Sequence, residues 1–226
     1  YTVLLCRESI TRRVLPFYLG RKEMTLISEP KKQLEEDLNK IYGSYTSGQQ
    51  WIKTPVFTKE LYKKHGLQVG KNQGENYKND LSTYGELTFK GLEIIIRRFR
   101  EHFNENSVFY DLGSGYGKVV SHVALRTDTD KSIGVEYDQG RVDDSLELIE
   151  KIKFPRATPR IIQGDILDQD YSDATIVYFD NTMYHKHFLV KLINEMLPKG
   201  CLLIYKNYGL EIGDRFIKVE TSYSSN

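Results

Sequence analysis

The sequence predicts an α/β protein: a mostly parallel sheet with helices on both faces, preceded by a smaller, mainly helical N-terminal extension. Two observations predict this class. From residue 87 onward, short β-rich apolar runs alternate with amphipathic helical segments, the pattern that builds a parallel sheet covered on both sides. The first 80 residues lack that alternation. We therefore divide the chain into an extension, residues 1–80, and a core, residues 81–226.

The extension is expected to hold two helices and a long loop. One helix begins at residues 28–30, carries an apolar stripe of Leu34, Leu38 and Ile41, and is predicted to end at Gly43. A second, short helix is expected over 58–64. Residues 66–83 are rich in Gly and Asn and have no apolar period, and a loop of that length is usually functional or disordered. We expect residues 66–86, which run from this loop into Tyr84-Gly85-Glu86, to act as a lid.

The core is expected to begin with a helix over 87–103, because apolar residues recur there at steps of three and four. Five strands are predicted at 108–112, 132–136, 160–164, 175–179 and 201–205, with a further strand in FIKVETSYS (216–224). Helices are expected between them, near 117–126, 141–153 and 185–197. Each strand would then be followed by a helix that covers one face of the sheet.

Composition excludes several classes of protein. The 226 residues are 39% apolar and 28% charged, as in an ordinary soluble protein. No apolar stretch approaches the roughly 20 residues that a membrane span needs, and the first residues lack the order of a signal peptide. The two cysteines, Cys6 and Cys201, suggest no disulfide framework. A cytosolic or nuclear protein is expected.

The net charge of +1 is unevenly distributed. Residues 1–80 hold 14 Lys and Arg against 9 Asp and Glu, whereas residues 81–226 hold 18 against 22. One interpretation is a solvated helical face. The other is a basic surface for an acidic partner such as nucleic acid or chromatin. The cations that would serve it are Arg12, Arg13, Lys31, Lys32, Lys63 and Lys64.

A glycine turn follows the first predicted core strand. The strand ends in Asp111, and the glycines are Gly113, Gly115 and Gly117. This G-x-G-x-G spacing differs from the dinucleotide pattern G-x-G-x-x-G, and Leu112 stands where a Walker loop needs its first glycine. Glycines let the backbone approach a ligand closely, and Asp111 offers a negative charge beside them. The combination suits a ligand with an ammonium group near a nucleoside, such as S-adenosylmethionine (SAM).

Two further acids end successive predicted strands. Glu136 ends the second strand, where a carboxylate can accept both ribose hydroxyls, and Asp165 follows the third, within reach of an adenine amino group. Each alone is more simply a solvated carboxylate, but three acids in register predict a SAM site at the carboxyl edge of the sheet. The fold class is then that of a class I, Rossmann-like methyltransferase. The segment FDNTMY (179–184) lacks the prolines typical of amino-adenine or cytosine methylation.

Six segments of the sequence resemble those of a known family. The segments that carry this resemblance are TYGELTF (83–89), DLGSGYGKVV (111–120), GVE (134–136), GD (164–165), VYFDN (177–181) and YKNY (205–208). They are similar to the disruptor-of-telomeric-silencing family, non-SET methyltransferases that modify a core-domain lysine of histone H3 in nucleosomes. The resemblance covers about residues 80–208. It implies a nuclear protein whose partner is the nucleosome, with DNA backbone contacts through the basic extension.

The resemblance also implies residue roles. The residues implied to contact SAM are Asp111, Gly113, Gly115, Glu136, Asp165 and Ile166, with Tyr84 and Glu86 in the loop that closes over the cofactor. The implied catalytic residues are Asp180, Asn181 and Tyr184. Four residues depart from the family pattern: Leu87, Lys118, Asp180 and Thr182.

The expected chemistry is methyl transfer to a lysine amine, which must first lose its proton. An apolar channel favours the neutral amine, and Tyr184 and Tyr223 are candidate channel walls, although either suits a plain core or surface position. No metal site is predicted, since His185 and His187 are splayed by their i,i+2 spacing. Two rival functions remain: an RNA or small-molecule methyltransferase, and an inactive methyltransferase-like binding module.

Overall fold

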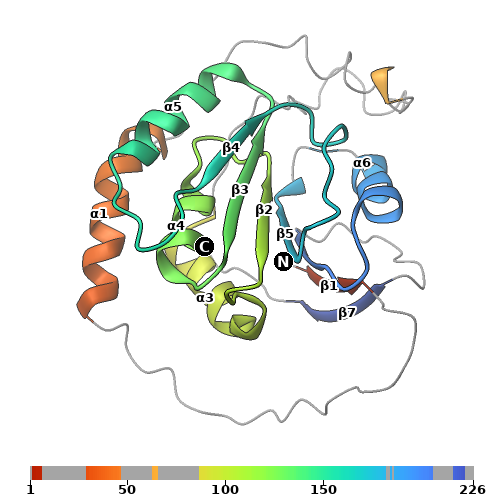
Figure 1. The fold of residues 1–226 in the computed structure, drawn as a ribbon, viewed down its shortest axis with the longest axis horizontal. Coiled ribbons are helices and arrows are strands. Elements are labelled where there is room, and N and C mark those ends of the chain that lie inside the picture. Colours follow the sequence, from red (N-terminus) through yellow and green to blue (C-terminus); the bar gives the residue numbers. More distant parts are fainter. Residues whose placement is uncertain are drawn as a thin grey trace.

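A seven-stranded sheet organises the molecule (Figure 1). The computed structural model describes residues 2–6, 29–46, 63–65, 87–181, 184, 186–205 and 216–221. Five parallel strands make up most of the sheet, with β4 at one edge: β2 (Val108–Leu112), β3 (Lys131–Glu136), β4 (Arg160–Gln163), β5 (Ile176–Phe179) and β6 (Leu202–Tyr205). Their bounds agree with the predicted ranges to within one residue.

The strand order is β4-β3-β2-β5-β6-β1-β7. The chain steps outward from β2 to β4 on one side and from β5 to β6 on the other, so the order reverses between β2 and β5. This is the doubly wound arrangement, in which ligands bind at the carboxyl ends of the strands beside the reversal. The predicted Rossmann-like fold of class I methyltransferases is confirmed.

Two strands complete the far edge of the sheet. β1 (Thr2–Cys6) runs antiparallel to both β6 and β7 (Phe216–Thr221). β7 lies within the predicted FIKVETSYS strand, whereas the sequence did not predict β1. The first residues of the chain therefore belong to the same sheet as the core.

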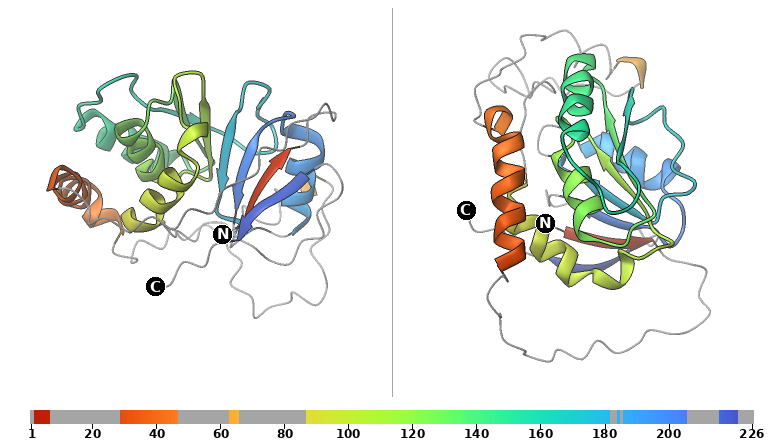
Figure 2. Two further views of the ribbon diagram at one scale, coloured as in Figure 1. Left: turned by 90° about the horizontal axis from the view of Figure 1, so that it is seen from below. Right: turned by 60° about the vertical axis from the view of Figure 1, so that its left-hand side comes forward.

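Helices cover both faces of the sheet. α3 (Phe89–Arg98), α4 (Lys118–Arg126) and α5 (Gln139–Glu150) lie on one side, and α6 (Lys186–Lys191) with the following π-helical turn (Leu192–Met196) lies on the other (Figures 1 and 2). Alternate residues of β2 confirm the two faces. Phe109 packs with the α3 and α4 side chains, whereas Tyr110 packs with those of α6.

α3 is shorter than the predicted helix over 87–103. It ends at Arg98, and a 3₁₀ turn, Arg100–His102, follows. Phe99 and Phe103 lie beyond the end of α3, yet each is only 5% exposed. The spacing of the apolar residues therefore predicted their burial correctly, although it predicted too long a helix.

α1 (Glu29–Thr46) packs against the core on the side of α5 (Figure 2). Its Leu38 and Tyr42 are fully buried in a cluster with Phe89, Tyr116 and Leu148. The prediction that the helix ends at Gly43 was wrong, because it continues for three more residues. A glycine inside a helix costs only about 1 kcal/mol, which the packing of the preceding turn outweighs. Among the described helices, none has the length and apolar character that a membrane crossing requires.

Candidate cofactor site at the carboxyl edge of the sheet

The glycine turn between β2 and α4 has the backbone conformation that its sequence predicts. Gly113, Gly115 and Gly117 have φ angles of 77°, 53° and 76°, a region that L side chains rarely adopt. The backbone N–H groups of Gly113 and Ser114 both donate to the carbonyl of Val135, at 2.8 and 3.0 Å. The turn is therefore held against the end of β3.

Gly134 in β3 makes that close approach possible, a role that sequence reasoning missed. A Cβ atom on Gly134 would lie 2.5 Å from Ser114 Oγ and 2.8 Å from Ile161 Cδ1, closer than real Cβ contacts. A side chain there would push the turn away from β3. The available signal was a glycine inside a predicted strand, which often marks a close backbone approach.

The three predicted acids come together. Asp111 in β2, Glu136 at the end of β3 and Asp165 just after β4 lie on adjacent strands, and all three are at most 6% exposed. Ile166, next to Asp165, is also buried. Because parallel strands end at the same edge, the sheet order itself forms this acidic row beside the glycine turn.

Glu136 supports the turn directly. Its Oε2 accepts the backbone N–H of Gly115 at 2.8 Å, and its Oε1 accepts that of Asp138 at 3.0 Å. Arg141 Nη1 lies 4.0 Å from Oε1. Burial raises the pKa of Glu136, while Arg141 and the two backbone donors oppose that rise. Each carboxylate oxygen retains one lone pair, so ribose hydroxyls can still donate to Glu136.

The Tyr184 side chain lies close to the glycine turn. Its hydroxyl lies 3.2 Å from the position that a Cβ of Gly113 would occupy. Its ring packs on Phe179 at the end of β5, with centroids 4.7 Å apart, and on Phe188 of α6 at 5.4 Å. The predicted catalytic tyrosine is therefore placed directly over the turn.

Two buried polar atoms near the turn lack hydrogen-bond partners among the described residues. They are Ser114 Oγ, within the turn, and Asn181 Oδ1, just after β5. Asn181 is 2% exposed, whereas its neighbour Asp180 is partly exposed. A buried polar atom without a partner is costly, so both atoms are suited to a polar ligand that supplies the missing bond. These features fit SAM at this edge.

α1 supports the turn from behind, which sequence reasoning also missed. The Tyr42 hydroxyl lies 2.8 Å from Ser121 Oγ, and it donates to the Gly117 carbonyl at 3.4 Å. Gly117 is the residue at which the turn becomes α4. A tyrosine at the end of an apolar helical stripe gave no signal beyond ordinary burial.

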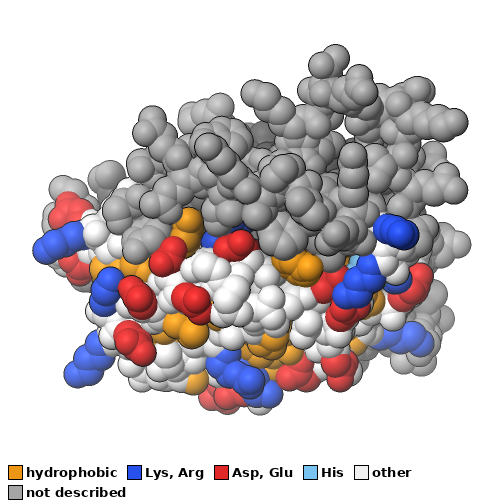
Figure 3. Space-filling view, turned by 90° about the horizontal axis from the view of Figure 1, so that it is seen from above, with side chains coloured by type: hydrophobic (Ala, Val, Ile, Leu, Met, Phe, Trp, Pro, Cys, Tyr) orange, Lys and Arg blue, Asp and Glu red, His pale blue; other side chains and the backbone are white. Residues whose placement is uncertain are grey.

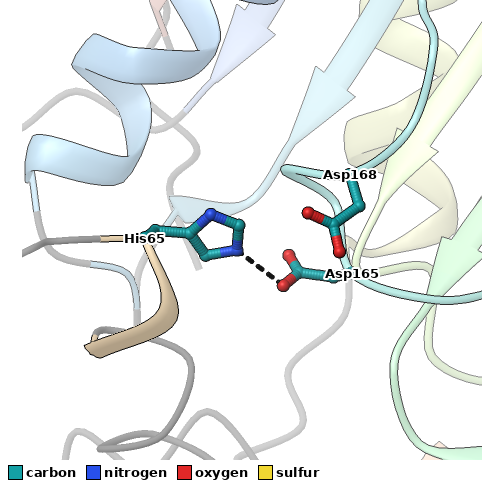
Figure 4. A group of neighbouring side chains, drawn as sticks. All are labelled: His65, Asp165 and Asp168. Atoms are coloured by element: carbon teal, nitrogen blue, oxygen red, sulfur yellow. Dashed lines mark hydrogen bonds and ion pairs between the residues drawn. The ribbon is translucent and has the colours of Figure 1, made fainter.

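Residues 63–65 of the extension contact Asp165 in the acidic row (Figure 4). His65 Nε2 lies 2.7 Å from Asp165 Oδ2, and Lys64 Nζ bonds both Asp165 Oδ2, at 3.2 Å, and Asp168. Burial alone would raise the pKa of Asp165, but the bonds from His65, the Leu167 N–H and Lys64 outweigh it and lower the pKa. No local pattern predicts this pairing, because about a hundred residues separate its members.

The side chains of His65, Asp165 and Asp168 have the composition of a metal-ligand group. However, the Lys64 ammonium already bonds both carboxylates and supplies a positive charge. We therefore interpret the group as an ion-pair cluster that joins the extension to the core. The sequence suggested Lys64 as one of the cations that dock on an acidic partner. In the structure its ammonium group bonds Asp165 and Asp168.

Several predicted residues lie outside the described part of the chain. They are Tyr84 and Glu86 of the closing loop, most of the expected 58–64 helix, the expected lid over 66–86, Arg12, Arg13, Thr182, His185 and Tyr223. Their predicted roles remain predictions.

The chain shares sequence with methyltransferases. The pattern of the family described as "Histone methylation protein DOT1" matches residues 67–152, which include the glycine turn and Glu136. The chain resembles the DOT1 family. This confirms the resemblance predicted from the sequence, and it supports SAM as the cofactor of the glycine turn.

Three relatives place the DOT1 resemblance in context. A protein-lysine N-methyltransferase of Saccharolobus islandicus is 34% identical over 110 residues, covering 47% of this chain and 63% of the relative. The histone-lysine N-methyltransferase, H3 lysine-79 specific, of Caenorhabditis elegans is 28% identical over 136 residues, covering 54% and 14%. Ribosomal RNA small subunit methyltransferase A of Lysinibacillus sphaericus is 27% identical over 178 residues, covering 73% and 54%. The chain thus spans less than two thirds of each of these relatives.

Proposed function

We propose that this chain is a SAM-dependent protein-lysine methyltransferase whose substrate is a core-domain lysine of histone H3 in nucleosomes. The observation that carries the proposal is the row of Asp111, Glu136 and Asp165 on three adjacent strands beside a glycine turn. The match to the DOT1 pattern supports the choice of a histone lysine as acceptor.

Each acid takes a different part of the cofactor. Asp111 faces the positively charged methionine end, Glu136 accepts the ribose hydroxyls, and Asp165 accepts the adenine amino group. The positive-φ glycines let backbone atoms approach the ligand without a Cβ between them. Gly115 and Ile166 complete the contacts, and Tyr84 with Glu86 closes over the methionine end.

The acceptor end is formed by the end of β5 and the residues that follow it. The rings of Phe179, Tyr184 and Phe188 form an apolar wall that favours a neutral amine over an ammonium. The unpartnered Asn181 Oδ1 accepts an N–H of that amine and directs its lone pair. Asp180, partly exposed, orients the incoming ammonium and accepts its proton. When bound, SAM supplies a methyl carbon to which the amine lone pair bonds as the carbon–sulfur bond breaks.

Docking on the nucleosome would use the cations of the extension. On the face drawn in Figure 3, acidic and basic side chains of the described residues are interspersed, so no single sign dominates it. Because Lys64 bonds Asp165, the cations that remain as candidates for docking are Arg12, Arg13, Lys31, Lys32 and Lys63. A nuclear location follows from this substrate.

Ribosomal RNA is the second candidate acceptor. The relative from Lysinibacillus sphaericus, named for that substrate, covers 73% of this chain. Against it, residues 179–184, from the end of β5 onward, read FDNTMY, without the prolines expected for amino-adenine methylation.

Methyl-labelled SAM distinguishes these functions when it is incubated with the protein and, separately, with nucleosomes, free histones and RNA. We expect label on histone H3 in nucleosomes, and mass spectrometry should place it on a core-domain lysine. Label only on RNA would refute the histone proposal and favour the second candidate. Tight S-adenosylhomocysteine binding with label on none of the three would favour an inactive binding module.

A further inference from the structure

The contact of the segment 63–65 with Asp165 has a consequence for cofactor selection. His65 and Asp165 are both enclosed: their side chains are 5% and 4% exposed. Lys64 is 49% exposed, so its bond can exchange with water at little cost. His65 is therefore the residue of the extension that holds the Asp165 carboxylate in place.

Counting lone pairs shows how much of Asp165 remains for a ligand. Oδ1 accepts the Leu167 N–H at 3.0 Å, and Oδ2 accepts from His65 and Lys64. A carboxylate offers about four acceptor positions, so one remains, on Oδ1. A single amino N–H can use it, provided that the carboxylate does not rotate. The His65 bond prevents that rotation by fixing Oδ2.

The ring of His65 also continues the aromatic wall of the site. It meets Phe188 edge-on, with centroids 6.0 Å apart and planes at 73°. Phe188 packs on Tyr184, whose hydroxyl lies over Gly113. A continuous row of rings thus runs from Asp165, at the adenine end, to the glycine turn.

We propose that His65 is a positioning residue that orients Asp165 toward the amino group of adenine, so that the extension sets the preference of the site for an adenine base. The inference rests on the proposed SAM site. It concerns the 63–65 segment rather than the core residues, and its test does not depend on methyl transfer.

The test compares two ligands that differ only at that amino group. S-adenosylhomocysteine carries the group, whereas its purine riboside analogue carries a hydrogen at that carbon and is otherwise identical, so it offers Asp165 no amino N–H. Isothermal titration calorimetry on the full chain should give an adenine preference of about 10-fold or more, the value of one hydrogen bond to a charged group. In His65→Ala we expect the preference to fall to within about 2-fold.

Two space-filling variants separate positioning from packing. His65→Gln keeps an N–H donor near Asp165 and should retain most of the preference. His65→Phe keeps a ring against Phe188 without a donor and should lose it. If His65→Ala does not fold, this pair carries the test alone. His102→Ala, at a more exposed histidine far from Asp165 in the sequence, is the matched control and should match the wild type.

The outcomes are distinct. A folded His65→Ala or His65→Phe that keeps the wild-type preference would overturn the role of His65 while leaving the cofactor proposal intact. An equal loss in His65→Gln and His65→Phe would show that the donor is irrelevant, and an affinity abolished by EDTA would replace the ion-pair cluster with a metal centre. Binding of neither ligand by the wild type would refute both proposals.

Discussion

Glu136 accepts the backbone N–H of Gly115 at 2.8 Å, so the carboxylate proposed to bind ribose also holds the glycine turn in shape. One side chain therefore couples the local backbone of the turn to the end of the neighbouring strand. Removing it should harm the turn and the ligand contact together.

Glu136→Ala should accordingly weaken S-adenosylhomocysteine binding by about 1.5–3 kcal/mol, the scale of hydrogen bonds to a charged group. It should also lower the thermal midpoint, because the N–H groups of Gly115 and Asp138 lose their acceptor. Calorimetry and thermal unfolding provide both readouts. Glu147→Ala, at an exposed position of α5, is the control, and unchanged affinity in folded Glu136→Ala would remove Glu136 from the pocket.

Gly113→Ala should destabilise the protein and weaken the ligand, because its φ of 77° costs an L residue about 1–2 kcal/mol. Its Cβ would also lie 3.2 Å from the Tyr184 hydroxyl. Combining it with Tyr184→Phe should recover the steric part of the loss and leave the backbone part, as measured by urea unfolding.

Gly43→Ala is the matched control for that experiment. Gly43 lies within α1, and no heavy atom outside its local backbone lies within 4 Å of a Cβ there. Alanine should therefore stabilise the chain by about 0.5–1 kcal/mol through helix propensity. Equal losses at Gly43 and Gly113 would argue against a special conformation of the turn.

Tyr42→Phe should cost about 1 kcal/mol, because it removes the hydroxyl bond to Ser121 behind the turn. A double-mutant cycle with Ser121→Ala isolates this bond: the two losses should not add. Amide exchange of Ser121, whose N–H donates to the Gly117 carbonyl, should quicken in Tyr42→Phe. Strict additivity, with no change in exchange, would mean that α1 does not support the turn.

Stability should fall at acid pH through Glu93, which His122 and Arg126 bond at 2.9 and 2.7 Å between α3 and α4. Burial alone would raise its pKa, but these bonds outweigh it and lower the pKa from 4.5 to about 2. The unfolded chain takes up the proton first, so this stabilisation is complete above about pH 4.5 and is lost toward pH 2. Burial also lowers the pKa of His122, so its contribution begins to fall below about pH 6.5.

Urea unfolding at several pH values checks this expectation. The free energies of unfolding of the wild type and Glu93→Gln should differ most at neutral pH and converge as the pH falls below 4.5. Glu101→Gln, at an exposed glutamate, should follow the wild type throughout. A constant difference across the pH range would contradict the lowered pKa.

Charge reversal in the extension tests the proposed docking. Replacing Arg12, Arg13, Lys31, Lys32 and Lys63 by Glu should reduce nucleosome methylation and its salt dependence, because fewer counterions are released from DNA. S-adenosylhomocysteine affinity should stay unchanged, since the set omits Lys64, which bonds Asp165. If nucleosome methylation and S-adenosylhomocysteine affinity were lost together, the variant would have a folding defect rather than a docking defect.

Some of the site could be predicted because its signals are local. The turn after β2 needs glycines at three alternating positions, and an acid at a strand end can be read from the residues around it. The parallel order of the strands then follows from their alternation with helices, which brings Asp111, Glu136 and Asp165 to one edge. Gly134 could have been noticed, but its contact with Ser114 depends on how closely two elements approach.

What the sequence alone determined is therefore the α/β core, the five parallel strands to within one residue, the glycine turn and the acidic row. Only the tertiary structure decided that β1 joins the far edge of the sheet, that Tyr42 lies behind the turn and that His65 bonds Asp165. The reason is physical: turn conformation and strand burial depend on neighbouring residues, whereas these contacts join segments about 75 to 200 residues apart. Such pairings depend on three-dimensional packing, which no local pattern of residues encodes.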